Sequence, residues 1–257
     1  MPRECIFCGG SADSREDVWP RWMTLRFVGD GTIEQERGPE LRMTTWRVNR
    51  PKLVVRRVCT RCNNRWMSQL QNRGKPIIER FWDQDEVVLD LNNCSALSQW
   101  AVMTAMVLQT LDEQGGWLFS EYDRTLMWHA QRIPSYVGVW IANCVGHTGT
   151  YSQGRSMTGT AQETQRRARA NAVTLAFGKL GIQVLKVVPD GDTRGLDWIA
   201  VGQGRGDWEN IALQIWPLKG DPVNWPPPRG IRCEEELELF AARFRSESNT
   251  PATETPL

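Results

Sequence analysis

Two pairs of cysteines constrain this chain more than any other feature of its sequence. Each pair has the spacing C-x-x-C, with Cys5 and Cys8 in the first pair and Cys59 and Cys62 in the second. Four thiolates in two such pairs are the donor set that a tetrahedral structural zinc ion prefers. The binding of such an ion contributes on the order of 10–16 kcal/mol, enough to decide whether a small unit folds. The sequence therefore predicts a structural zinc ion that joins two distant segments, the alternative being two coincidental thiol pairs.

The cysteines also bear on the compartment of the protein. Seven is an odd number, and C-x-x-C pairs in an intracellular chain indicate metal binding rather than disulfides. The first residues, MPREC, contain no apolar signal region, and no apolar run reaches the roughly 18 residues of a membrane helix. We therefore expect a cytoplasmic protein with no membrane partner. Cys94, Cys144 and Cys233 are isolated, and we expect each to be a buried free thiol.

The charge of the chain is unevenly distributed. Residues 1–80 contain 16 Lys and Arg against 9 Asp and Glu, a net charge of +7. The remaining residues contain 15 against 21, a net charge of −6. A basic N-terminal third favours a polyanionic partner, with nucleic acid as the leading candidate. A solvated charged surface would explain the same counts.

The pattern of residues divides the chain into two regions and a tail. Residues 1–82 predict a zinc-binding domain in which two strands within residues 41–58 lead to a helix that starts at Asn63 and ends before Gly74 and Pro76. Residues 93–245 predict an α+β domain of unassigned role, through which a protein partner could bind. Residues 246–257 have the composition of a disordered tail. The fold class is α+β.

The second region opens with a strongly apolar helix. Its residues, from about Ser95 to Leu111, place apolar side chains at steps of three and four, so we expect it at the centre of the domain. Five strand-like runs follow, and the last predicted element is an amphipathic helix. The strand-like runs are Tyr136–Cys144, Ala172–Phe177, Ile182–Val188, Trp198–Val201 and Ile211–Trp216, and the final helix is Glu234–Arg245.

In chain order, the runs CIFCG, SREDVWPRW and VCTRCNNRWMSQL resemble the HNH endonuclease family, in its branch with a four-cysteine zinc. The resemblance covers about residues 3–72 and implies a ββα-metal finger. In that family an acidic residue and an asparagine hold a divalent cation on the scissile phosphate, and a histidine deprotonates water. The resemblance implies Glu16 as the acidic ligand, Asn63 as the asparagine and Mg or Mn as the catalytic ion.

The chain departs from the family at the general base. Asp17 stands where the histidine is expected, and the two histidines of the chain, His129 and His147, lie far outside the motif. An aspartate is a much weaker base than a histidine near neutral pH, so a large loss of rate is the simple expectation. Two carboxylates could instead hold the cation more strongly and let it activate water. His147 could also reach the site from the second region, or be a polar loop residue.

Further residues are candidates for contact with nucleic acid. By the same resemblance Arg61, Asn64 and Arg65 could contact phosphate beside Asn63. Tryptophans among arginines can stack on bases, although a small domain also needs them in its core. Trp22 is the tryptophan that we expect to be available for stacking.

These features predict an HNH-like zinc protein that binds nucleic acid, with DNA favoured over RNA. It would be a divalent-cation-dependent endonuclease if Asp17 is tolerated at the base position. The alternative is a catalytically inactive HNH scaffold that binds nucleic acid or protein. A pure interaction protein that uses zinc only to fold is the third reading. Before Val18 and Trp19, the Glu16–Asp17 pair could also be no more than a charged turn.

Overall fold

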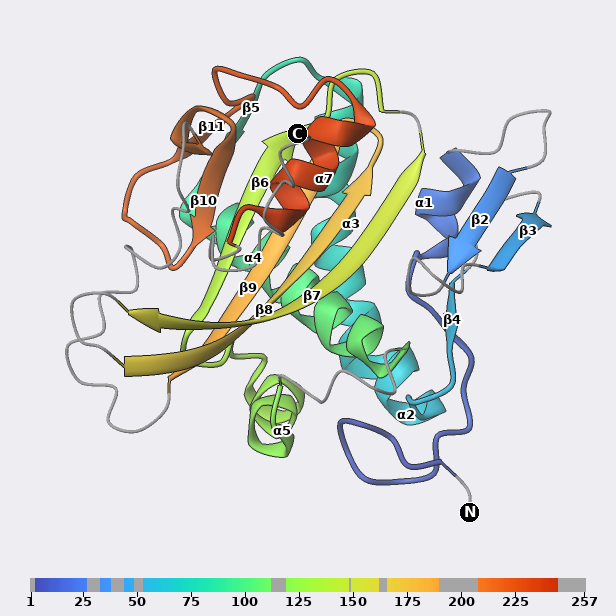
Figure 1. The fold of residues 1–257 in the computed structure, drawn as a ribbon. Coiled ribbons are helices and arrows are strands. Elements are labelled where there is room, and N and C mark those ends of the chain that lie inside the picture. Colours follow the sequence, from blue (N-terminus) through green and yellow to red (C-terminus); the bar gives the residue numbers. More distant parts are fainter. Residues whose placement is uncertain are drawn as a thin grey trace, which may run out of the picture.

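The computed structural model describes residues 3–26, 33–37, 44–48, 53–111, 119–147, 149–161, 166–189 and 208–244. It has the mixed α+β architecture that the sequence predicts, with antiparallel sheets and helices on both sides of the largest sheet (Figure 1). The predicted strand Trp198–Val201 and the predicted tail 246–257 lie outside the described residues. In the part of the chain described, none of the helices is long and apolar enough to cross a membrane.

The central element is a five-stranded antiparallel sheet with the strand order β10-β6-β9-β8-β7. Its strands are β6 (Val137–Asn143), β7 (Thr150–Ala161), β8 (Arg166–Phe177), β9 (Leu180–Pro189) and β10 (Ala212–Trp216). The strands β7, β8 and β9 form a meander, in which Phe177 pairs with Leu180 across a tight turn at Gly178. The sequence did not indicate β7, because TYSQGRSMTGTA alternates poorly and contains two glycines.

Both faces of the sheet are covered. On one face lie α3 (Ser68–Asp83) and α4 (Leu91–Leu108), and on the other lies α7 (Glu234–Ala242), as Figure 1 shows. Along β6, Val139 and Ile141 belong to the core on the side of α4, whereas Trp140 and Ala142 belong to the core on the side of α7. A strand covered on both faces is apolar at every position rather than at every second one, which explains the run VGVWIA.

The remaining elements are short and surround the two ends of the sheet. Two-residue strands β1 (Glu16–Asp17) and β4 (Val54–Val55) pair with each other in antiparallel register. Two other small pairs are β2 (Ile33–Arg37) with β3 (Thr44–Val48), and β5 (Val87–Leu89) with β11 (Val223–Trp225). The short helical elements are α1 (Arg21–Arg26), α2 (Thr60–Cys62), the π-helical turn η2 (Asn63–Met67), η3 (Gln109–Leu111), α5 (Glu121–Ala130) and η4 (Trp208–Asn210).

The predicted end of the helix before Gly74 is wrong. From Thr60 the chain is helical through α2 and η2, and α3 continues past Gly74 and Pro76 to Asp83. Gly74 faces α4, and a Cβ there would lie 3.2 Å from Cγ of Trp100. Glycine is therefore present for close packing of two helices. The apolar residues on the far side of Pro76 bury the rest of the helix, which offsets the intrinsic cost of proline.

The buried core is continuous across the predicted boundary between residues 82 and 93. Phe177, at the end of β8, makes edge contacts with Trp19, Trp82 and Trp100, with ring centroids 5.4, 6.0 and 5.8 Å away. The indole Nε1 of Trp82 also donates a 3.0 Å hydrogen bond to the carbonyl oxygen of Phe177. The N-terminal part is thus packed directly on the sheet of the second region, and the domain division stays a prediction.

The three isolated cysteines, which we expected to be buried free thiols, differ in solvent exposure. Cys94 and Cys144 are buried as expected, but Cys233 is exposed. Cys233 is the residue immediately before α7 and has extended backbone there, so its side chain is on the outside of the turn that starts the helix. Its predicted burial is therefore wrong.

Candidate metal centre and adjoining carboxylate site

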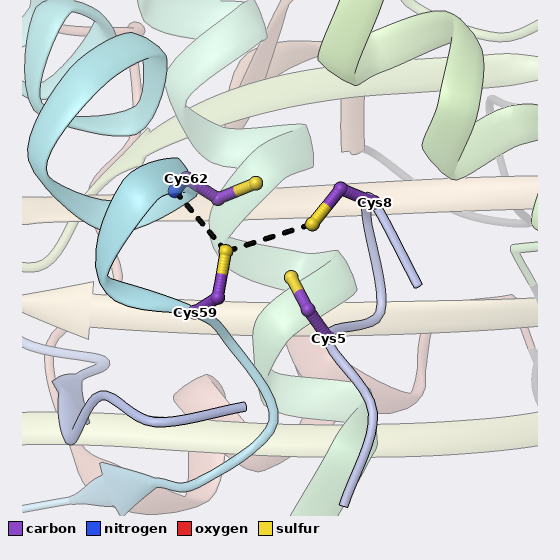
Figure 2. Close-up of side chains that lie close together, drawn as sticks. All are labelled: Cys5, Cys8, Cys59 and Cys62. Carbon is purple, nitrogen blue, oxygen red and sulfur yellow. Dashed lines mark hydrogen bonds between the residues drawn. The ribbon is translucent and has the colours of Figure 1, made fainter. Parts of the chain in front are cut away.

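The four predicted cysteine ligands lie together in the structure. The sulfur atoms of Cys5, Cys8, Cys59 and Cys62 all lie within 4.8 Å of one another, and those of Cys8 and Cys59 are 3.5 Å apart (Figure 2). Metal–sulfur bonds of about 2.3 Å in a tetrahedron place sulfurs roughly 3.8 Å apart. The cluster could therefore hold a metal ion, and its donor set is compatible with structural zinc.

The first pair of cysteines is held by a tight turn. The amide of Cys5 donates to the carbonyl of Gly10 at 2.6 Å, and the amide of Gly9 donates to the carbonyl of Cys5 at 2.9 Å. Gly9 has φ of +70°, a left-handed conformation that glycine adopts without strain. A further hydrogen bond of 2.9 Å runs from the amide of Ile6 to the carbonyl of Arg57, so the first turn is fixed to the segment that carries the second pair.

The second pair stands at the start of a helix. Cys59 is the N-cap of α2, where its sulfur accepts a hydrogen bond from the amide of Cys62 at 3.4 Å. The exposed carboxylate of Asp13 accepts from the amide of Thr60 at 2.7 Å. That hydrogen bond lowers the pKa of Asp13. Asp13 is a supporting residue that the sequence did not indicate.

Burial of the cluster bears on its protonation. Burial raises the pKa of the Cys62 thiol and of the Cys8 thiol, whereas at Cys59 burial is outweighed by hydrogen bonds with the neighbouring cysteines, which lower its pKa. The buried thiols of Cys8 and Cys62 therefore favour the neutral form unless a positive charge compensates the thiolate. A divalent cation is the partner that would let all four lose their protons, which is consistent with a metal centre.

Directly beside the cluster lies a buried carboxylate. Only 6% of Glu16 is exposed, and its Oε1 accepts a 3.2 Å hydrogen bond from Nε2 of Gln71 on α3. The Asn63 side chain also lowers the pKa of this carboxylate, as a nearby hydrogen-bond donor does. Burial, together with the charge of Asp17, raises the pKa of Glu16 to about 7. The structure thus brings Glu16 close to Asn63, the residue that directly follows Cys62. The roles of Glu16 and Asn63 in binding a catalytic cation stay predictions.

The π-helical turn explains how Gln71 joins this pair. Asn63 and Gln71 are eight residues apart, which in a regular α-helix leaves them about 80° apart around the axis. The π-helical turn η2 takes up an additional residue, so the remaining spacing is close to two full turns. Both side chains then face β1. Sequence spacing alone did not indicate Gln71, because a π turn has no strong sequence signal.

Asp17 lies in a different position from Glu16. The pairs Glu16–Val55 and Asp17–Val54 follow one another in regular register. Successive side chains of a strand point to opposite faces, so Asp17 is directed away from the face on which Glu16 contacts α3. Glu16 is buried and Asp17 is half-buried, in agreement with this alternation.

The histidines lie elsewhere. His129 is on α5 against Trp128, with ring centroids 3.9 Å apart, and His147 lies close enough to Glu234 to feel its charge. The base position predicted by the HNH motif is therefore not filled by a histidine from another element.

Of the residues predicted to contact nucleic acid, three lie on one helical segment and the fourth, Trp22, lies on another element. Arg61, Asn64 and Arg65 are exposed on the helical segment that carries Asn63. Trp22 is half-buried, lies 5.8 Å from the ring of Trp82 and has Lys75 above it. Arg61 and Lys75 are fourteen residues apart along a nearly continuous helix, a separation of roughly 20 Å. Trp22 therefore lies beside the part of the helical segment around Lys75, away from Arg61.

Comparison with protein-family models, with curated proteins and with solved structures gave no match. Inference about function accordingly depends on the residues of the metal cluster and of the carboxylate site.

Proposed function

We propose that this protein is a zinc-stabilised, HNH-like protein that binds nucleic acid, and that Glu16 and Asn63 bind a divalent cation for phosphodiester hydrolysis. The observation that supports the proposal is the buried Glu16 carboxylate, whose pKa the Asn63 side chain lowers, together with the place of Asn63 directly after the cluster cysteine Cys62. Carboxylate and amide oxygens are the hard ligands that Mg and Mn prefer, whereas thiolates suit zinc. The chain would thus separate a structural from a catalytic ion.

Each residue of the site has a distinct task in this proposal. Glu16 supplies negative charge at a fixed position, since it is buried and its strand is paired with β4. Gln71 donates to one carboxylate oxygen and so orients the group. Asn63 offers an amide oxygen from the first turn after Cys62. A bound Mg or Mn ion would neutralise charge on the phosphate and polarise it for attack by water.

A second candidate function is favoured by Asp17. Without a histidine next to Glu16, and with Asp17 directed to the other face of the β1–β4 pair, the site has no obvious side-chain base. The protein would then be an inactive HNH-like scaffold that binds nucleic acid without cutting it. Such binding should weaken steeply with salt, because contacts with phosphate release counterions.

A cleavage assay separates the two functions. The purified zinc-loaded protein would be incubated with Mg or Mn and with supercoiled plasmid, single-stranded DNA or RNA. Asn63→Ala removes the amide ligand, Asp17→His restores the histidine, and Asn92→Ala is the matched control on an exposed position of α4. Cleavage by the parent that is lost only in Asn63→Ala supports the nuclease.

Other outcomes assign the alternatives. Cleavage by Asp17→His alone indicates an intact site that lacks its base, and hence a nucleic-acid-binding scaffold. If no variant cuts and none retards nucleic acid, the HNH-like proposal is wrong and zinc serves folding only.

A further inference from the structure

Four arginines surround a cavity next to the carboxylate site. Arg3, Arg15, Arg56 and Arg57 line a cavity of about 350 Å³, whose remaining walls come from β4 and from Thr110 and Leu111 at the end of η3. Among the described residues that line it there is no carboxylate. Because one water occupies roughly 30 Å³ of liquid, the space is large enough for a phosphate group and part of the sugar attached to it.

The four arginines that line this cavity favour the binding of an anion. An arginine side chain keeps its charge at every physiological pH and presents a planar fork of donors that fits a phosphate in bidentate fashion. Four such groups around one space give it a positive potential, which favours an anion. The positive charge of Arg57 also acts on Arg124, but Arg124 is engaged elsewhere, since its Nε donates to the carbonyl of Ile6 at 2.9 Å.

The cavity and the carboxylate site are parts of one strand pair. Arg15 directly precedes Glu16 on one strand, and Arg56 directly follows Val55, the partner of Glu16, on the other. Glu16 points into the protein toward α3, and the arginines at this end of the pair are next to it along the chain. An anion bound in the cavity would therefore lie beside the β1–β4 pair that carries Glu16.

We propose that this arginine-lined cavity binds a backbone phosphate of a DNA strand, beside the β1–β4 pair that carries Glu16. The inference rests on the proposed function and extends it, because it assigns the contact that positions the strand to arginines for which the HNH resemblance implies no role. Arg15 and Arg56 are the principal contacts, since both are exposed and directly flank the strands β1 and β4.

The test is the salt dependence of DNA binding. Fluorescence anisotropy with a labelled 20-base-pair duplex would compare the zinc-loaded parent, the double variant Arg15→Gln/Arg56→Gln and the control Arg232→Gln, an exposed arginine before α7. Each lost phosphate contact should reduce the slope of log K against log salt by about 0.9, so the double variant should lose nearly two. We expect its affinity to fall about ten- to hundredfold at low salt. The control should bind like the parent.

Two further binding measurements distinguish which phosphate-bearing ligand occupies the cavity. Pyrophosphate and an RNA duplex of the same sequence would be measured on the same proteins, with thermal melting to show that each variant is folded. Unchanged DNA affinity and slope in the folded double variant overturn the inference, even if Asn63→Ala shows that the protein is a nuclease. If the double variant loses affinity for pyrophosphate alone, or for RNA alone, the inference is overturned in favour of that ligand. A parent that does not bind DNA overturns it as well.

Discussion

The side-chain amide of Gln71 donates a hydrogen bond of 3.2 Å to the carboxylate of Glu16, which connects α3 to β1 inside the protein. This bond and the nearby Asn63 side chain lower the pKa of Glu16, but burial and the charge of Asp17 outweigh them and raise it from 4.5 to about 7. The folded protein therefore binds a proton more tightly at Glu16 than the unfolded chain does. As a result, stability is lost as the pH rises from about 4.5 through about 7.

Replacing this carboxylate should stabilise the protein above neutral pH. Glu16→Gln has the same shape and no charge to bury, so its free energy of unfolding should exceed that of the parent at pH 8 by up to roughly 3 kcal/mol. The difference should shrink toward pH 5, where the folded parent is already protonated. Urea denaturation at pH 5 and pH 8, without added Mg, measures it. Glu86→Gln, at an exposed position, should show no such pH dependence, and an equal effect of Glu16→Gln at both pH values would contradict the prediction.

Loss of one cysteine of the cluster should remove the metal and much of the stability. Cys62→Ser should bind less than one metal ion per chain and lose several kcal/mol of unfolding free energy, since structural metal binding contributes on the order of 10 kcal/mol. Elemental analysis by mass spectrometry and thermal melting provide the two readouts. Cys233→Ser is the matched control, because this cysteine is exposed and outside the cluster. Equal metal content in both variants would exclude the four-cysteine centre.

A methyl group at Gly74 should weaken the contact between α3 and α4. In an exposed helix Gly→Ala stabilises by about 1 kcal/mol, but here the added Cβ would lie 3.2 Å from the fully buried Trp100. Overpacking typically costs 1–3 kcal/mol, so we expect Gly74→Ala to lose about 1 kcal/mol net. Gly154→Ala, where the new Cβ meets nothing within 4 Å, is the comparison. A Gly74→Ala variant more stable than the parent in urea would show that Trp100 can move.

Truncation of Phe177 should destabilise the whole protein in one step. This fully buried ring lies among Trp19, Trp82 and Trp100, so Phe177→Ala should cost about 3–5 kcal/mol. Tryptophan fluorescence and circular dichroism should then report a single, earlier unfolding transition in urea. Leu239→Ala, at a side chain that is 62% exposed, should change stability by less than about 0.5 kcal/mol. Separate transitions for the two signals would indicate that the two regions unfold independently.

Much of the fold could be predicted from local patterns. The apolar periodicity that indicated a helix from Ser95 to Leu111 corresponds to α4 and η3, and the run Ile182–Val188 lies within β9. By contrast, α5 was missed although Ser120 and Asp123 form a capping box that the sequence displays. The extent of α3 could not be predicted, because Gly74 and Pro76 are breakers in isolation and only the packing against Trp100 makes them compatible with a helix.

The sequence predicted those residues of the candidate site that have a recognisable spacing along the chain. It did not predict the residues that only tertiary contacts bring to the site. The C-x-x-C pairs indicated the four sulfur atoms that lie together. Gln71 depends on a π-helical turn, and Asp13 depends on a turn that places it beside Thr60, so neither has a spacing that could be recognised. The arginine cavity combines residues from four separate places in the chain, and only the fold shows that Arg3 and Arg15 lie near Arg56.

The packing of Phe177 against Trp19 and Trp82 has a consequence for how such a chain can evolve. A zinc unit with its own closed core can be recombined between genes as a portable cassette. Here the aromatic surface of the N-terminal part is completed by a residue more than ninety positions downstream of Trp82. Transplanting the N-terminal part into another protein would leave those indoles exposed, so the two parts are expected to have been inherited together and to share one evolutionary history.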